Sequence, residues 1–411
     1  MLLFRVFSIP VRFFIALLIY FSWGPLAEGV VTAPVPEFSS PALIPYPSKV
    51  VRGAGEAGFR SVQVKVGPGR DDLMKEIKDI FRTSGIQGSL NSGGAAEGAM
   101  TWELFPDARM KGEGYDLSVG LGKATVRAGS FGGFFNALQT LRQLVFNREG
   151  EFAMPVVRIS DKPAFVLRGV MLDVGRYYMS PALIKEVMRR LSRYKINTLH
   201  LHLTDDPAWR MEVKKYPALT DGAFHWKSRL PGRFYTQAQL KDLTDYCARL
   251  NIQVIPEIDM PGHSQPFARA MKTGMQTEKG VSILKDVVDE AVSLFPGRFF
   301  HMGSDEAHIS MKDFIPRMAE HIRGKGKEVV VWSPGGPHDK DSVLMCWGEN
   351  EAGARMDKNM KRIDSNGFYI DWADSQSGVY QVFFQQPCEV PQGDDKALGA
   401  IMPVWCDGNL S

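Results

Sequence analysis

From Phe165 to the end of the chain, strand-like and helix-like segments alternate, which constrains the fold more than any other feature of the sequence. Amphipathic spacing predicts helices at 181–194, 237–250, 281–295 and 311–324. Strands that alternate with helices form parallel sheets, and about 250 residues of this pattern are typical of a closed (β/α)₈ barrel. An open doubly wound sheet is the alternative, although the chain has no glycine-rich nucleotide turn. The eight predicted strands lie at 166–173, 198–203, 253–258, 299–302, 329–332, 342–347, 368–372 and 399–404.

The first 29 residues have the pattern of a targeting segment. Arg5 and Arg12 lead into an apolar run, Phe13 to Phe21, and Ala27 and Gly29 offer small residues for cleavage. This predicts a signal peptide over residues 1–29 and an exported protein, periplasmic or secreted. The apolar run is short for a stable membrane span, and an uncleaved signal anchor is the alternative.

Two folded parts are predicted after the targeting segment. Residues 30–160 begin with a proline-rich stretch and continue with mixed strand and helix patterns, which indicate a small α+β domain. Residues 161–411 form the predicted barrel. Only six residues follow Trp405, too few for an eighth barrel helix, so that helix is expected to be missing.

Composition excludes several classes of function. A content of 44% hydrophobic and 23% charged residues describes a folded protein. The net charge of +3 and the absence of Lys/Arg runs argue against a nucleic acid partner. The four cysteines lack metal-ligand spacing, so we predict neither a metal nor a cofactor and make no disulfide assignment.

Polar and aromatic residues gather just past the predicted strand ends. In a (β/α)₈ barrel these ends meet at one face, where the chemistry of such proteins is located. A single acid or tryptophan there would be explained by helix capping or packing, but a full circle of them indicates a binding site. The circle comprises Asp173, Arg176, His202, Asp205, Asp206, Trp209, Glu257, Asp259, His263, Asp305, Glu306, Trp332, Trp347, Tyr369, Asp371, Trp405 and Asp407.

The fourth strand leads into two adjacent carboxylates, Asp305 and Glu306. Successive side chains of a strand point to opposite faces, so both can share one pocket only if the backbone has left the strand. Gly303 and Ser304 allow that departure. Carboxylates that share a cavity do not both ionise freely, and one is expected to keep its proton near neutral pH. One proton donor and one anion are suited to glycosidic bond cleavage.

Four ordered segments resemble family-20 glycoside hydrolases, the β-N-acetylhexosaminidases. They are Arg168 to Tyr178, Leu199 to Trp209, Pro256 to His263 and His301 to Glu306, at the first four strand ends of the predicted barrel. The first domain, with Gly132 to Leu141, resembles the non-catalytic N-terminal domain of that family. The resemblance extends from about residue 45 to the end of the chain.

The resemblance implies an exo-acting, retaining hydrolase of terminal β-linked N-acetylglucosamine or N-acetylgalactosamine. Its substrate would be an oligosaccharide or glycoconjugate. The 2-acetamido oxygen of the substrate would attack C1 and form an oxazolinium ion. By match, Glu306 would be the general acid and base, and Asp305 would orient the acetamido N–H and stabilise the positive charge.

The other rim residues take binding roles through the same resemblance. Arg176 would hold ring hydroxyls, Asp205 would lie beside the catalytic pair, and His263, backed by Asp259, would contact Glu306. Tyr369 would donate to the acetamido oxygen, and Asp371 would lie near the outer hydroxyls. The aromatic box around the acetamido methyl would consist of Trp332, Trp347 and Trp405.

One departure and two rival functions accompany this hypothesis. The family usually carries Trp-x-Glu where this chain has Trp405-Cys406-Asp407, so the shorter Asp407 would contact the sugar near C4. An endo-acting chitinase would need a spaced run of acids on the fourth strand, which this chain lacks. A sugar-binding protein on a catalytically weakened scaffold is the non-enzymatic alternative.

Overall fold

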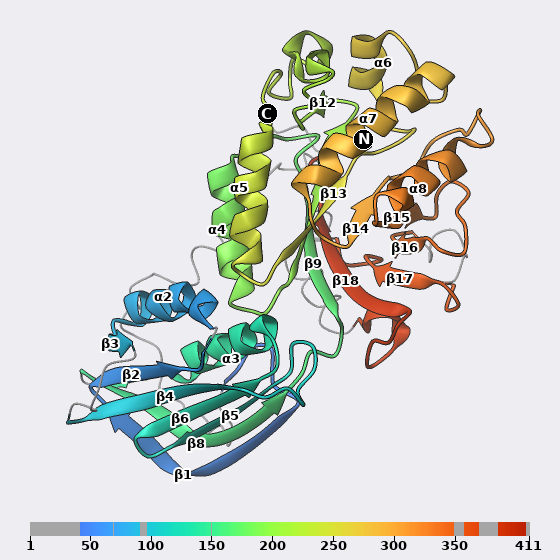
Figure 1. Cartoon of the computed structure of the whole chain (residues 1–411). Helices are drawn as coiled ribbons and strands as arrows, with labels where there is room; N and C mark the ends of the chain where they lie inside the picture. The colour runs from blue at the N-terminus through green and yellow to red at the C-terminus, as the bar shows by residue number, and fades with distance from the viewer. Residues whose placement is uncertain are drawn as a thin grey trace, which may run out of the picture.

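The computed structural model describes residues 42–68, 70–90, 97–148, 150–348, 357–369 and 385–407. The predicted signal peptide, residues 1–29, lies outside the described residues. Among the described helices, none combines the length and the apolar character needed to cross a membrane. The described chain forms two successive folded parts. The first is a sheet with helices on one face, and the second is a barrel (Figure 1).

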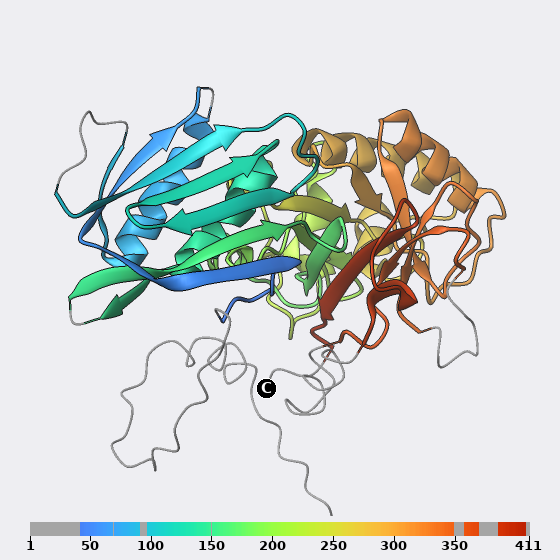
Figure 2. The same cartoon turned by 90° about the horizontal axis from the view of Figure 1, so that it is seen from below.

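The N-terminal part is one mixed sheet with the strand order β1-β8-β5-β6-β4-β2-β3, and β7 pairs with β8. Its strands are β1 (Lys49–Phe59), β2 (Ser61–Val66), β3 (Gln87–Leu90), β4 (Ala99–Pro106), β5 (Tyr115–Gly120), β6 (Lys123–Ala128), β7 (Phe146–Arg148) and β8 (Glu151–Asp161). Its helical elements are η1 (Asp71–Leu73), α2 (Met74–Ser84) and α3 (Phe131–Leu144). Figure 1 shows α2 and α3 on the face of the sheet that is turned toward the barrel, and Figure 2 shows the sheet from the side without helices.

Alternating side chains explain why this sheet has one covered face. In β5 the residues Tyr115, Leu117 and Val119 are buried, and the residues between them are exposed. Helix α3 begins at Phe131 because the Ser130 hydroxyl accepts a hydrogen bond from the Gly133 N–H, at 3.0 Å. The buried faces of the sheet and the helices form one apolar core.

The second part is a closed barrel of parallel strands, which confirms the predicted fold class. The strands follow the order β10-β13-β14-β15-β16-β17-β18-β9 around the barrel. Figure 1 shows them with helices α4 and α5 on one side and α7 and α8 on the other. Their bounds are β9 (Leu167–Asp173), β10 (Thr198–His202), β13 (Gln253–Glu257), β14 (Phe299–His301), β15 (Glu328–Ser333), β16 (Val343–Cys346), β17 (Lys361–Asp364) and β18 (Ala397–Val404).

The described helices of the barrel follow β9, β10, β13 and β14 along the chain. They are α4 (Pro181–Ser192), α5 (Gln237–Ala248), α6 (Gln265–Met271), α7 (Glu278–Leu294) and α8 (Phe314–Gly324). Short elements complete the loops: β11 (Thr204–Asp205), β12 (Ala208–Trp209), η2 (Pro217–Thr220), η3 (Gly222–Phe224) and η4 (Pro387–Glu389). Helix α5 begins with a capping box in which Thr236 and Gln239 satisfy each other's backbone N–H groups. The expected absence of an eighth helix concerns residues after Asp407, which lie outside the described residues.

The seventh strand was predicted at 368–372 and instead lies at Lys361–Asp364. Three of its four residues are charged, which conceals a strand from any apolar pattern. Arg362 is nevertheless buried because its guanidinium donates to the backbone carbonyls of Lys358 and Cys388. Asp364 is buried because it accepts from the Cys388 N–H, at 2.7 Å. Tyr369 therefore lies in the loop after the strand.

Charged groups link the N-terminal part to the barrel. Arg189 of α4 donates to Glu76 of α2, at 2.7 Å, and also pairs with Asp79. Lys195 pairs with Asp161 at the end of β8, at 3.0 Å. The Glu76 and Lys195 side chains are each 5% exposed or less, so these links are largely shielded from solvent and attach the two parts firmly.

Candidate active site

A cavity of about 510 Å³ lies at the C-terminal ends of the barrel strands. This is the face at which barrel enzymes carry their chemistry, so the position agrees with the expectation from the sequence. Residues from the ends of all eight barrel strands reach the cavity although they are far apart in the sequence. The lining consists of Arg176, His202, Asp259, His263, Asp305, Glu306, Trp332, Trp347, Tyr369, Trp405 and Asp407.

The backbone turns sharply between β14 and the two carboxylates. Strand β14 ends at His301, and Gly303, Ser304 and Glu306 then have φ angles of 69°, 84° and 48°. These left-handed conformations end the strand's alternation and let both Asp305 and Glu306 line the cavity. A Cβ atom on Gly303 would lie 1.8 Å from Asp259 Oδ1, so glycine is required there. The predicted departure from the strand is confirmed.

Carboxylates on three sides fix the guanidinium of Arg176. Its three nitrogens lie 3.2 Å from Asp173 Oδ2, 3.0 Å from Asp205 Oδ2 and 2.8 Å from Asp407 Oδ1. The guanidinium also lies over the Trp405 ring, at 4.9 Å from the ring centroid. A guanidinium has five N–H donors, so donors remain for a ligand while the side chain stays in place.

His263 connects Glu306 to a buried acid. Its Nε2 lies 3.2 Å from Glu306 Oε2, and its Nδ1 lies 3.5 Å from Asp205 Oδ1. We expected Asp259 behind His263, but the structure places Asp205 in that position. The contact with Asp205, opposed by burial and assisted by the charge of Asp259, raises the pKa of His263 to about 10. His263 is therefore a cation beside Glu306 at neutral pH.

Burial sets the protonation of the neighbouring acids. Burial and the negative charge of Glu257 raise the pKa of Asp305 to about 7, and Glu306 adds to this effect. Burial and the charge of Asp305 also raise the pKa of Asp259 well above its ordinary value. Asp259 and, in part, Asp305 thus keep a proton near neutral pH, whereas the resemblance gave the acid role to Glu306. A ligand N–H or a cation placed against Asp305 would favour its ionised form.

Aromatic rings form one wall of the cavity. Trp332 and Trp405 lie with ring centroids 5.7 Å apart and an interplanar angle of 43°. The Trp347 indole N–H donates to the Pro334 carbonyl, at 2.9 Å, which fixes the ring. Tyr369 is half-buried and also lines the cavity. This wall offers an apolar surface that fits a methyl group or a sugar ring.

Of the twelve residues to which the resemblance gave a role, all but two line the cavity. Asp205 lies just behind the lining, in contact with Arg176 and His263. Asp371 lies outside the described residues. From the sequence we placed His202 and Glu257 at strand ends but assigned them no catalytic or binding role. The structure pairs Glu257 with His202 on one neighbouring strand and with His301 on the other. Such a row of polar residues in register was the signal that could have identified them.

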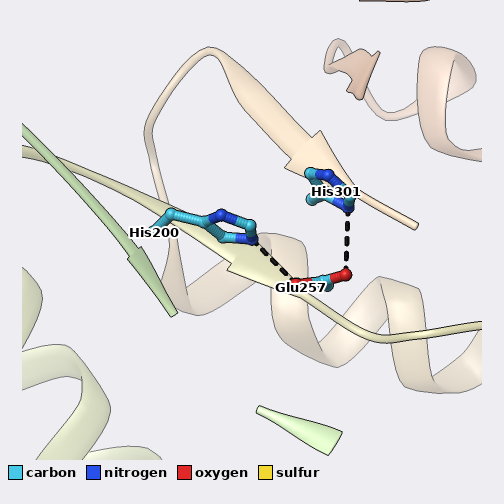
Figure 3. A group of neighbouring side chains, drawn as sticks. All are labelled: His200, Glu257 and His301. Carbon is cyan, nitrogen blue, oxygen red and sulfur yellow. Dashed lines mark ion pairs between the residues drawn. The ribbon is translucent and has the colours of Figure 1, made fainter. Parts of the chain in front are cut away.

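Two histidines and a glutamate deep in the barrel have potential metal ligand atoms within 4.8 Å of one another: His200, Glu257 and His301. Figure 3 shows one imidazole at each oxygen of the carboxylate, and the two rings stack with centroids 4.7 Å apart. Yet the Gly303 N–H donates to His301 Nδ1, at 3.0 Å, and both Glu257 oxygens already accept hydrogen bonds, from Trp332 and His202. Glu257 and His301 are thus held by hydrogen bonds, whereas neither nitrogen of His200 nor Nε2 of His301 has a hydrogen-bond partner among the described residues. We assign no metal to this group.

A (β/α)₈ barrel with this rim of acids, histidine and tryptophans belongs to a class of proteins that act at the C-terminal face of the barrel. Comparison with known families is more specific. The model of the catalytic domain of glycosyl hydrolase family 20 matches residues 165–311, and the model of domain 2 of that family matches residues 40–162. The chain belongs to glycosyl hydrolase family 20.

Individual relatives agree with this assignment. A β-hexosaminidase of Vibrio furnissii is 29% identical over 372 residues, which cover 71% of this chain and 61% of the relative. A β-hexosaminidase of Porphyromonas gingivalis is 32% identical over 375 residues, which cover 72% of this chain and 48% of the relative. The chain thus spans about half to three fifths of the length of these curated relatives. A Streptomyces plicatus β-hexosaminidase solved in complex with the product N-acetylglucosamine is 26% identical, with a TM-score of 0.75 over 88% of this chain and 85% of that one.

Proposed function

We propose that this protein removes terminal, non-reducing, β-linked N-acetylglucosamine or N-acetylgalactosamine from oligosaccharides or glycoconjugates. One observation carries the proposal: a single cavity brings together Asp305, Glu306, the fixed guanidinium of Arg176 and the tryptophan wall. The β-hexosaminidases among its relatives and the complex with N-acetylglucosamine support the choice of sugar.

Proton transfer is assigned to Glu306. Its side chain is 58% exposed, so it can reach an oxygen that leaves toward solvent. In the first half of the reaction Glu306 would donate a proton to the glycosidic oxygen, and in the second half it would accept a proton from water. The cation of His263, at 3.2 Å, would stabilise the carboxylate that forms between these two steps.

The nucleophile is assigned to the substrate. Its 2-acetamido oxygen would attack C1 and form an oxazolinium ion, with retention of configuration after water attacks. Asp305, as a carboxylate, would accept the acetamido N–H and balance the positive charge. The wall formed by Trp332, Trp347 and Trp405 would press the acetamido group toward C1, which is a proximity effect.

Exo specificity is supported by the acids that surround Arg176 at one end of the cavity. The ion pairs of Arg176 with Asp173, Asp205 and Asp407 occupy that end. The free donors of Arg176 would bind hydroxyls on the non-reducing side of the terminal sugar, and Asp407 would accept from a hydroxyl near C4. The rest of the oligosaccharide, on the reducing side of the scissile bond, would then extend past Glu306.

The test is hydrolysis of an aryl β-N-acetylglucosaminide followed by proton NMR. The first sugar released should be the β anomer. First appearance of the α anomer would refute the substrate-assisted scheme. Absence of any hydrolysis, together with binding of N-acetylglucosamine, would indicate the sugar-binding alternative.

Export is part of the same proposal. The basic and apolar pattern of residues 1–29 supports a cleaved signal peptide and a periplasmic or secreted protein. Expression of the full chain in a bacterial host and sequencing of the mature N-terminus should give a start shortly after Ala27 or Gly29. A full-length, membrane-attached product would support the signal anchor instead.

A further inference from the structure

Glu257 is a fully buried carboxylate at the centre of the barrel's polar interior. It is the last residue of β13 and has 0% exposure. Its Oε2 lies 2.6 Å from His202 Nδ1 and 2.9 Å from His200 Nε2, and its Oε1 accepts from the Trp332 indole N–H, at 2.7 Å. His301 Nδ1 lies 3.2 Å from Oε1 (Figure 3). Its carboxylate thus accepts hydrogen bonds from His202 and Trp332 and lies within 3.2 Å of two further imidazoles, so polar neighbours compensate its burial.

A continuous path of close contacts leads from Glu257 to Glu306. His202 is 1% exposed and uses its second nitrogen, Nε2, to contact Asp205 Oδ2 at 2.9 Å. Asp205 then contacts His263, and His263 contacts Glu306, at 3.5 Å and 3.2 Å. Acid and imidazole alternate along the whole path, so each group is held by partners of the opposite character.

A second path leads from Glu257 to the aromatic wall. The indole N–H of Trp332 donates to Glu257, and Trp332 lies against Trp405. The orientation of the Trp332 ring is therefore tied to the same carboxylate that begins the first path. A glutamine at position 257 could still accept this hydrogen bond through its amide oxygen, so the second path, unlike the first, does not depend on the negative charge of Glu257.

The negative charge of Glu257 keeps His202 protonated, and His202 in turn helps to keep Asp205 ionised. Burial alone would lower the pKa of His202, but the Glu257 carboxylate raises it well above its ordinary value. Burial would likewise raise the pKa of Asp205, but the hydrogen bonds from His202 and His263 lower it. Without the charge of Glu257, the pKa of His202 would fall because its largest raising influence is removed, and Asp205 would lose a charged hydrogen-bond donor.

We propose that Glu257 is a positioning residue for the reaction, which acts through His202, Asp205 and His263 to hold Glu306 where it can protonate the departing oxygen. This proposal rests on the proposed function. Glu257 does not line the cavity, so its effect on the substrate is indirect. Its loss should therefore disturb the step that depends on Glu306 more than it disturbs binding.

The test compares Glu257→Gln with the wild type on two substrates. One is N,N′-diacetylchitobiose (called chitobiose below), whose leaving group is a sugar that needs a proton, and the other is 2,4-dinitrophenyl β-N-acetylglucosaminide, whose leaving group needs none. General acid catalysis contributes about 100- to 10,000-fold, so we expect kcat on chitobiose to fall by roughly 100-fold. We expect kcat on the dinitrophenyl substrate to fall by less than about 5-fold, with little change in KM.

Glu113→Gln is the matched control. Glu113 is also a largely buried carboxylate with several donors, Arg168, Asn197 and Asn251, but it does not line the cavity. This variant should unfold at a lower temperature than the wild type and keep the wild-type ratio of kcat on the two substrates. A general loss of packing is thereby separated from an effect on proton transfer.

His202→Gln decides the question if Glu257→Gln does not fold. It breaks the first link and leaves Glu257 in contact with His200 and Trp332, and it should show the same selective loss on chitobiose. Equal losses on both substrates, in whichever variant folds, would overturn the proposal. A wild type that hydrolyses neither substrate would instead overturn the proposed function.

Discussion

At the scale of single residues, the surroundings of the two adjacent carboxylates differ. Asp305 is largely buried, and burial together with the charge of Glu257 raises its pKa to about 7. Glu306 is 58% exposed in its side chain and faces the cation of His263. The buried acid is suited to a fixed electrostatic role inside the cavity, and the exposed acid is suited to exchange of protons with a leaving group and water.

Glu306→Gln is expected to lose activity in proportion to the leaving group's need for a proton. Hydrolysis of chitobiose should fall by about 100- to 10,000-fold, whereas hydrolysis of a dinitrophenyl glycoside should fall far less in its first step. The measurement is the pre-steady-state release of dinitrophenol compared with steady-state turnover of chitobiose. Equal losses in the two assays would mean that Glu306 has another role.

The pKa of Asp305 predicts an acid limb in the pH profile. The role proposed for Asp305 needs a carboxylate, and a pKa of about 7 means that the protonated form accumulates below that pH. For an aryl substrate that needs no general acid, kcat/KM should therefore fall about tenfold for each pH unit below about 7. Asp305→Asn should be slower at every pH and should lack this limb. A limb that persists in this variant would assign it to another group.

At the scale of elements, the short strand β14 and the turn after it determine the site. Ser304 has a φ of 84°, where only glycine is comfortable, and its buried hydroxyl has no hydrogen-bond partner within the part of the chain that the structure describes. Ser304→Gly removes the left-handed strain and the unpaired hydroxyl, which outweighs the greater entropy of glycine in the unfolded chain.

We expect Ser304→Gly to stabilise the fold by about 1 kcal/mol and to raise Tm by a few degrees. Calorimetry measures this change, and Ser310→Gly in the following loop serves as the control. A lower Tm for Ser304→Gly would show that the hydroxyl makes a stabilising contact that outweighs the strain.

Elements differed in how well the sequence predicted them. Seven strands of the barrel were placed within a few residues because apolar runs of buried parallel strands are easy to recognise. Strand β17 was missed because the charged residues Lys361, Arg362 and Asp364 interrupt the apolar pattern, and the burial of Arg362 and Asp364 depends on Cys388, which is distant in the sequence. The same reason applies to the site. Side chains at strand ends were predictable, but the exchange of Asp259 for Asp205 behind His263 depends on packing in three dimensions.

At the scale of the whole molecule, buried charges hold the N-terminal sheet against the barrel. Glu76 of α2 accepts from Arg189 of α4, at 2.7 Å, and from Arg142 and Gln139, both at 2.9 Å. Burial would raise the pKa of Glu76, but Arg189 and the other partners lower it, so this stabilisation is present at neutral pH and decreases as the pH falls through the lowered pKa.

Glu76→Gln should leave the largely buried guanidinium groups of Arg142 and Arg189 with only one of the two carboxylates that they share. Breaking a buried ion pair costs about 3–5 kcal/mol, so calorimetry should show a loss of roughly 10 °C in Tm. Glu320→Gln, an exposed position on α8, is the control and should change Tm little. An unchanged Tm for Glu76→Gln would mean that the Asp79 carboxylate alone maintains the contact.

In the proposed reaction, the substrate's own acetamido group is the nucleophile. The most direct test is the ratio of kcat/KM on 4-nitrophenyl β-N-acetylglucosaminide to kcat/KM on 4-nitrophenyl β-glucoside, which lacks only that group. We expect hydrolysis of the first substrate and a kcat/KM on the second that is lower by at least about 1,000-fold, because proximity effects of intramolecular groups are large. Comparable values of kcat/KM on the two substrates would contradict the account and make Asp305 a candidate nucleophile.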